Sequence, residues 1–234
     1  MLSGSFDLAA ADAICSGDAV RGGAISDLLD HLVAKSIVST SRRDERVRYR
    51  MLVTVRQFGV ERLAELDDGD ELATRHRDHY LGRAEAMARD WCGPGQAEVL
   101  ADHANLRAAL EWSLRRPDQA RATARLAASL RYHWVVGGFL SEGRYWLDQA
   151  LSALPGPCPE RGEALWVVSW VCLVQGDHAA AAARLTESAA LAERLGDAAL
   201  AAHAAHWSGL AALFAGDPAG AVPLYERGPV QLRE

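Results

Sequence analysis

The stretch Ser26–Leu66, SDLLDHLVAKSIVSTSRRDERVRYRMLVTVRQFGVERLAEL, decides the fold of the first part of this chain. Ser26 belongs to a residue type that is favoured at helix N-caps, so we expect a helix to begin there. The apolar residues that follow it share one helical face: Leu28, Leu29, Leu32 and Val33. The helical pattern stops at Ser36, and a short strand is expected to begin with Ile37.

A second strand and a second helix complete this stretch. In the segment Arg46–Met51, three large side chains alternate with three arginines, which is typical of a half-buried strand. Thr54 and Gln57 have the spacing of a capping box, so we expect the next helix to begin at Val55. The predicted buried side of this helix is Val55, Phe58, Leu63 and Leu66. The order helix, β-hairpin, helix predicts a winged-helix unit.

The chain on both sides of this unit is predicted to be helical. Asp7 can cap a short helix at residues 8–15. Residues 71–90 and 96–114 have helical apolar spacing, and Pro117 suits the start of a further helix. The run DDGD at 67–70 breaks the pattern and marks a domain junction. We therefore expect a winged-helix domain at 1–68, a helical bundle at 69–136 and helical repeats at 137–234.

The C-terminal part of the chain repeats itself. Gly138, Gly176 and Gly216 each follow a Trp-bearing apolar helix and precede an Ala-rich helix, at spacings of 38 and 40 residues. Each unit should bury one small and one large residue, namely Gly143, Ala181 and Ala221, and Leu147, Leu185 and Tyr225. Such units bury a core by stacking, as tetratricopeptide-like arrays do. Pro223 and Pro229 are predicted to interrupt the last helix, which leaves the array incomplete. The predicted fold class is mainly α, with a small winged-helix unit before this array.

Composition sets limits on the kind of protein. Half of the 234 residues are apolar and the net charge is −6, yet the segment Arg42–Arg62 carries seven arginines against three acidic residues. No leader and no apolar run long enough for a membrane helix is visible, so we expect a cytoplasmic protein. The four cysteines are widely spaced, which favours reduced thiols.

Four segments of the sequence carry a resemblance to a known family: LLDHLVAKSIV, RYRMLVTVRQFGVERLAEL, RHRDHYL and NLRAALEWSL. They resemble the region that follows the ATPase module in bacterial LuxR-type regulators of the STAND class, and the likeness covers essentially the whole chain. In those regulators the winged unit helps to hold the ATPase closed and the repeats sense a partner or ligand. The resemblance implies a regulatory protein-interaction module that lacks the ATPase and the C-terminal helix-turn-helix. We expect a shortened regulator or a split-gene fragment, whose ATPase partner would be encoded separately.

No catalytic, cofactor or metal site is predicted. The only lysine, Lys35, has no preceding Gly-rich turn, so no phosphate-binding loop is present. In the resembled family the step from strand to helix can carry Met-His-Asp, whose His approaches ADP, but residues 51–53 read Met-Leu-Val here. His76 with His79, and His203 with His206, have a spacing that suits two ligands but lack a third. We therefore expect no enzyme.

Five arginines form a candidate nucleic-acid surface: Arg42, Arg43, Arg46, Arg48 and Arg50. Arginines can follow phosphates, and a winged helix can place a helix in the major groove. Asp27, Asp30 and His31 make the candidate recognition helix acidic, however, and the arginines can instead be solvated or pair with acidic repeats. A stand-alone DNA-binding transcription factor is therefore an alternative that ranks below protein contacts.

Aromatic residues in the repeats suggest a partner site. Five tryptophans lie in or beside the repeats, and most are expected in the core: Trp134, Trp146, Trp166, Trp170 and Trp207. Tyr145 and Trp146 are neighbours, so we expect one of the two to be exposed in a groove for a protein partner. A small-ligand sensor built on the repeats is a second alternative. The apolar last unit is a candidate contact between two copies of the chain.

Overall fold

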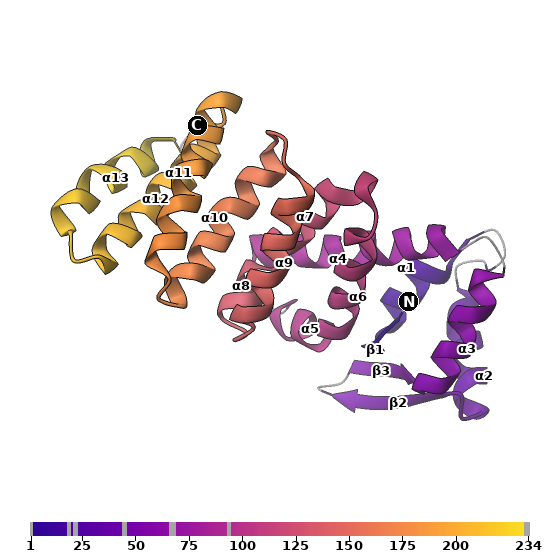
Figure 1. Ribbon diagram of the computed structural model, residues 1–234. Coiled ribbons are helices and arrows are strands. Elements are labelled where there is room, and N and C mark those ends of the chain that lie inside the picture. Colours follow the sequence, from indigo (N-terminus) through magenta and orange to yellow (C-terminus); the bar gives the residue numbers. More distant parts are fainter. Residues whose placement is uncertain are drawn as a thin grey trace. The chain divides into compact units, whose positions relative to one another are not determined.

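The computed structural model describes residues 2–17, 20, 23–43, 46–65, 69–92 and 95–231 (Figure 1). These residues are mainly helical with one small antiparallel sheet, which confirms the predicted fold class. They form two compact units, residues 1–112 (unit 1) and 113–234 (unit 2). The boundaries expected at 68 and 136 differ from this division and stay predictions.

Unit 1 contains the sheet and the helices around it. Its elements are β1 (Ser5–Phe6), α1 (Leu8–Cys15), α2 (Ala24–Ala34), β2 (Val38–Arg43), β3 (Arg46–Met51), α3 (Val53–Ala64), α4 (Gly69–Arg89), α5 (Gly95–Ala101) and most of α6 (His103–Leu114). The strand order is β1-β3-β2, and both pairs are antiparallel. The predicted hairpin of β2 and β3 is therefore confirmed. β1 was not predicted, because two residues are too few to show a strand alternation.

One of the three N-caps predicted for the helices of unit 1 is confirmed, and two are wrong. The carboxylate of Asp7 accepts a hydrogen bond from the backbone N–H of Ala10 at 2.8 Å, and α1 has the predicted bounds. The prediction for Ser26 is wrong, because α2 begins two residues earlier, after Gly23 in the left-handed conformation (φ 90°). The predicted capping box of Thr54 is also wrong. α3 begins at Val53, directly after the strand, without a side-chain cap.

The apolar faces of unit 1 are buried only in part. Tyr49 is 9% exposed and lies beside Phe6, with the ring centroids 5.9 Å apart. Leu29 is also buried, whereas Leu28 is 45% exposed. Phe58 is 57% exposed, so its predicted burial is wrong. Leu66 lies outside the described residues. The largest fully buried side chains of this unit are Phe6, Ile14, Val38, Tyr80, Leu106 and Leu110.

Unit 2 is built from helical hairpins. Its elements are the short 3-10 helix Pro117–Gln119, α7 (Ala120–Ser129), α8 (Arg131–Val135), α9 (Leu140–Ala153), α10 (Pro159–Val174), α11 (His178–Leu195), α12 (Ala198–Phe214) and α13 (Pro218–Gln231). Helices α7 and α8 pair with α9, α10 pairs with α11, and α12 pairs with α13 (Figure 1). Each hairpin packs against the next one.

The predicted repeat register agrees with this arrangement. Gly138, Gly176 and Gly216 lie in the turns inside the three hairpins, and all three have positive φ, between 78° and 83°. The small position is buried in every unit, as Gly143, Ala181 and Ala221. The predicted interruption by Pro223 and Pro229 is wrong, because α13 extends to Gln231. A proline inside a helix removes one backbone donor and its ring clashes with the carbonyl of residue i−4, yet α13 continues through both positions.

Gly143 is the residue that lets α9 approach α8. The indole ring of Trp134 on α8 is fully buried, and its N–H donates to the carbonyl of Ala127 at 2.8 Å. A Cβ atom at position 143 would lie 2.6 Å from the Cβ of Trp134 and would also overlap the indole ring. The two later units have alanine at this position, and Cys172 and Ala212 at the position that corresponds to Trp134.

We predict that Gly143→Ala lowers the free energy of unfolding by about 1–3 kcal/mol, because overpacking a close contact displaces side chains and backbone. Gly156→Ala is the matched control, since a Cβ there meets nothing within 4 Å. The measurement is urea unfolding followed by circular dichroism. Equal midpoints for the two variants would show that the contact of Gly143 with Trp134 is not tight.

Candidate interaction surfaces

A buried carboxylate, Asp102, lies where the helix predicted for residues 96–114 is interrupted. The chain forms α5 and α6 there in place of one helix, and Asp102 stands between them. Its carbonyl accepts from the N–H groups of Asn105 and Leu106, which starts α6. Its side chain is 2% exposed. A buried carboxylate destabilises a protein unless it is paired and hydrogen-bonded, so its partners decide whether this site can form.

Two arginines hold Asp102. Arg48 of β3 donates to Asp102 Oδ1 at 2.5 Å, and Arg83 of α4 lies 3.2 Å from Oδ2. Arg48 also donates to the hydroxyl of Ser5 at 2.9 Å and to its carbonyl at 2.7 Å. Arg83 donates to the carboxylates of Asp7 and Glu98, both at 2.8 Å. These bonds join β1, β3, α1, α4 and α5.

The group is balanced in charge. Arg46 pairs with Glu98, so three arginines face three carboxylates: Arg46, Arg48 and Arg83 with Asp7, Glu98 and Asp102. Burial raises the pKa of Asp102 above its ordinary value, although Arg83 and Arg48 act against this. At Asp7 burial also acts to raise the pKa, but Arg83 and the N–H of Ala10 outweigh it, and the pKa is lowered. We call these six residues the arginine–carboxylate cluster.

Asn105 fixes the first strand to the same place. Its Oδ1 accepts from the N–H groups of Ser3, at 2.7 Å, and Gly4, at 3.3 Å, and its Nδ2 donates to the carbonyl of Ser5 at 2.9 Å. Asn105 is fully buried. No local pattern indicates this role, because the bonded residues lie about one hundred positions away in the chain.

The five candidate nucleic-acid arginines do not form one free surface. Arg48 is largely enclosed in the arginine–carboxylate cluster, with a side chain that is 11% exposed. Arg46 is paired with Glu98, although its side chain is 60% exposed. Arg42 and Arg50 are exposed. The side chain of Arg43 lies outside the described residues. Whether the remaining arginines contact DNA stays a prediction.

We predict that Arg48→Gln lowers the free energy of unfolding of unit 1 by about 3–5 kcal/mol, because it leaves the buried Asp102 with one counter-charge fewer. Arg50→Gln, an exposed change on the same strand, should alter it by no more than about 0.5 kcal/mol. Chemical denaturation of both variants measures the difference. A small effect at position 48 would mean that the cluster does not stabilise the fold.

His76 on α4 is a buried imidazole beside Tyr80. It is 3% exposed, and its Nε2 has no hydrogen-bond partner among the described residues. The ring centroids of His76 and Tyr80 are 4.8 Å apart. Burial is the main reason why the pKa of His76 is lowered to about 3. This residue is therefore a neutral part of the core.

This burial predicts how stability changes with pH. Below its ordinary pKa of about 6.5 His76 gains a proton in the unfolded chain, whereas in the folded chain it does so only near pH 3. The unfolded state binds more protons in this window, so acid destabilises unit 1, by up to about 1.4 kcal/mol per pH unit from this group. We expect His76→Gln to reduce the slope of unfolding free energy against pH between 6 and 4.

His206→Gln, at an exposed position of unit 2, is the control for this measurement. Denaturation curves at a series of pH values give the slopes. An unchanged slope in His76→Gln would assign the acid sensitivity to other groups.

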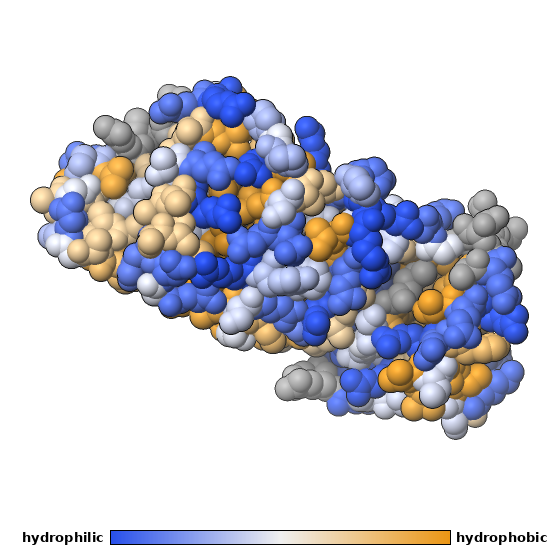
Figure 2. Space-filling model, in the orientation of Figure 1, coloured by the Kyte–Doolittle hydropathy of each residue, from blue (hydrophilic) through white to orange (hydrophobic). Residues whose placement is uncertain are grey.

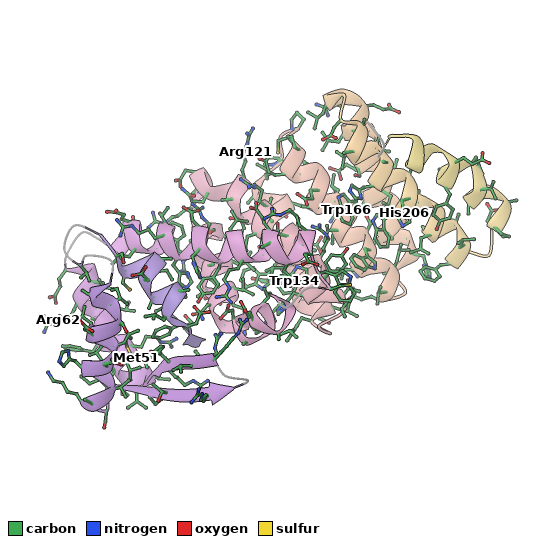
Figure 3. All side chains as sticks on the ribbon, turned by 180° about the vertical axis from the view of Figure 1, so that it is seen from behind. Met51, Arg62, Arg121, Trp134, Trp166 and His206 are labelled. Atoms are coloured by element: carbon green, nitrogen blue, oxygen red, sulfur yellow. The ribbon has the colours of Figure 1, made fainter. Side chains whose placement is uncertain are left out.

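A cavity of about 510 Å³ lies in unit 1. Its apolar lining comes from α1, α3, α4 and the end of β3, and includes Ile14, Met51, Val60, Leu63 and Leu72. Met51 is marked in Figure 3. Two arginines also line it, and their bonds are internal: Arg56 donates to the carbonyl of Ser3 at 2.9 Å and Arg75 to that of Ser16. The volume is in the range of small-molecule sites.

The thiols show no sign of activation. All four cysteines are free, and Cys158 and Cys172 are buried. Burial raises the pKa of both buried thiols, which makes the reactive thiolate rarer.

In unit 2 the two residues of the predicted groove differ in their exposure. Tyr145 is 53% exposed, whereas Trp146 is 4% exposed and donates from Nε1 to Glu142 at 3.1 Å. Their rings meet edge to face, with centroids 5.0 Å apart. Tyr145 is thus the exposed member of the pair, and its role in partner binding stays a prediction.

A different set of aromatic residues meets across the first helices of the hairpins. Trp170 on α10 stacks on Trp207 of α12 at 4.7 Å and meets Tyr132 of α8 at 5.6 Å. Trp166 stacks on His203 at 4.6 Å. Figure 3 shows Trp166 and His206 on these neighbouring helices. The sequence pointed to the tryptophans but could not show that they meet.

Comparisons with known proteins relate the chain to regulators. It is 35% identical over 151 residues to proteins named "Putative HTH-type transcriptional regulator" from Mycobacterium bovis and from two strains of Mycobacterium tuberculosis. The aligned region covers 63% of this chain and 17% of each relative. No protein-family model and no solved structure matches the chain. None of the described helices is long and apolar enough to span a membrane. The chain is thus similar to a short part of proteins named as transcriptional regulators.

Proposed function

We propose that this chain is a non-catalytic protein-interaction module of a transcriptional regulator. The similarity to the mycobacterial regulators supports the regulatory role. A small winged-helix-like unit comes before helical hairpins in the chain. This order supports the more specific proposal that the chain corresponds to the central region of a LuxR-type STAND regulator. In this proposal the repeats are tetratricopeptide-like and contact a protein partner.

The internal bonding of Arg48, whose side chain is 11% exposed, is the observation that favours protein contacts over DNA. A DNA-binding wing needs arginines that are free to meet phosphates. The central arginine of β3 is instead bound to Asp102 and Ser5, and Arg46 is paired with Glu98. The basic segment of the sequence therefore supplies counter-charges to the helices of unit 1. Three arginines with described side chains on the two strands are exposed, Arg42, Arg46 and Arg50, and Arg46 is paired with Glu98.

A non-catalytic role is part of the proposal. Within the described ranges no group of three or more His, Cys, Asp or Glu side chains could hold a metal ion. The raised pKa values of the buried thiols argue against a cysteine nucleophile. The small-ligand alternative draws support from the cavity in unit 1, which has room for an apolar molecule.

We predict no saturable binding to a labelled random 30-base-pair duplex at protein concentrations below about 10⁻⁴ M in 0.15 M salt, the weak end of non-specific binding. Fluorescence anisotropy at several salt concentrations measures this. Tight binding that falls steeply with salt, and that is weakened in the double variant Arg42→Gln, Arg50→Gln, would favour the DNA-binding alternative. The double variant removes only exposed charges, so it should fold like the wild type.

A further inference from the structure

Three exposed apolar side chains occupy the same position in the three hairpins. Val136, Val174 and Phe214 each precede the turn glycine by two residues, and they are 48%, 46% and 54% exposed. A soluble surface tolerates single apolar residues, but a patch repeated in register across neighbouring helices is typical of a binding site. Figure 2 shows apolar residues at the surface of the hairpins between hydrophilic ones.

A second row lies next to the first. One helical turn earlier in each hairpin stand Tyr132, Trp170 and Leu210, all half-buried. Residues four positions apart share one face of a helix, so each hairpin contributes one pair to the same face. We call these six residues the apolar stripe: Tyr132, Val136, Trp170, Val174, Leu210 and Phe214.

Ring contacts show that the apolar stripe is continuous from helix to helix. Tyr132 meets Trp170 edge to face, and Trp170 stacks on Trp207, which shares its helix face with Leu210 and Phe214. The ring of Phe214 lies 6.0 Å from that of His178, which follows the turn after Val174. The first helices of the three hairpins therefore present one joined apolar surface.

The apolar stripe suits an uncharged partner that offers hydrogen-bond acceptors. None of the six residues carries a fixed charge. The guanidinium of Arg131 lies over the ring of Tyr132, 5.4 Å from its centroid, but Arg131 is already paired with Glu163 at 3.5 Å. The indole N–H groups of Trp170 and Trp207 make no hydrogen bond within the described part of the chain. An indole N–H can only donate. A charged partner would lose hydration here, and the charge of Arg131 is already balanced by Glu163.

The spacing of the stripe fits an extended partner. Packed helices lie roughly 8–10 Å apart, so the apolar pairs recur at about this distance. A polyproline II chain rises about 3.1 Å per residue with three residues per turn, which returns a side chain to one face every ~9.3 Å. Its carbonyls have no internal hydrogen bonds and can accept from indoles. A helical partner uses its carbonyls within its own backbone, and a strand repeats its side chains too closely.

We propose that the apolar stripe binds an uncharged, proline-rich segment of a partner protein in the polyproline II conformation, with one side chain for each hairpin. This names the partner class of the module under "Proposed function" and rests on that function. Trp170 and Trp207 donate to backbone carbonyls of the segment, and Val174 and Phe214 contact the proline rings.

Titration of the full chain with an acetylated and amidated proline nonamer, followed by calorimetry and tryptophan fluorescence, tests this. We expect saturable binding that is at least about tenfold tighter than binding of a Gly-Ser nonamer, which lacks apolar rings. Val174→Glu places a charge in the stripe and should weaken binding about tenfold or more. Trp170→Phe keeps a ring but removes the donor, and should weaken it by about three- to tenfold.

Val222→Glu is the matched control, because Val222 is 55% exposed on α13 outside the stripe. It should bind the nonamer like the wild type, and circular dichroism should show all variants folded. No binding of the proline nonamer, or equal weakening by both Glu variants, would overturn the proposal. The same holds if sedimentation shows a dimer that Val174→Glu dissociates, since a second copy would then cover the stripe. Salt-sensitive binding of the 30-base-pair duplex would contradict the proposed function, but it would not bear on the binding of the proline nonamer.

Discussion

The fold of unit 1 depends on the burial of one carboxylate between two arginines. Asp102 is almost fully buried, and its charge could not stay there without Arg48 and Arg83. The three residues come from β3, α4 and the break between α5 and α6. Because each of these arginines also bonds other elements, the strand, the first turn of α1 and the later helices hold one another in place. The small sheet and the helices that follow it are therefore tied together within unit 1.

Local patterns in the sequence were enough to predict most of the elements. Alternation predicted β3, the cap of Asp7 predicted α1, and the recurrence of glycine predicted the turns of the hairpins. Helix starts were less predictable. Ser26 and Thr54 are good capping residues, but α2 and α3 begin where the preceding turn and strand end. Chain connectivity outweighed side-chain preference there.

The candidate site was less predictable than the fold, because it depends on residues far apart in the chain. Arg46, Arg48 and Arg50 look equivalent in the sequence, since all three lie on one side of the strand. Only the positions of Asp102 and Glu98 show that Arg48 is enclosed and that Arg46 is paired, whereas Arg50 stays exposed. Net charge in a sequence window therefore overstated the charge available to a partner. The apolar stripe was missed for a related reason, since its members become neighbours only when the hairpins stack.

The similar packing faces of the hairpins would allow such a chain to gain or lose whole repeat units. Each hairpin packs on the next through similar faces, and each carries its own turn glycine and its own pair of stripe residues. Gain or loss of one 38- or 40-residue unit by recombination would therefore rejoin compatible surfaces and would not leave a gap in the core. Such an event would lengthen or shorten the stripe by one step. A gene that encodes such repeats could therefore change the length of the apolar stripe without changing the pair of residues that each hairpin contributes to it.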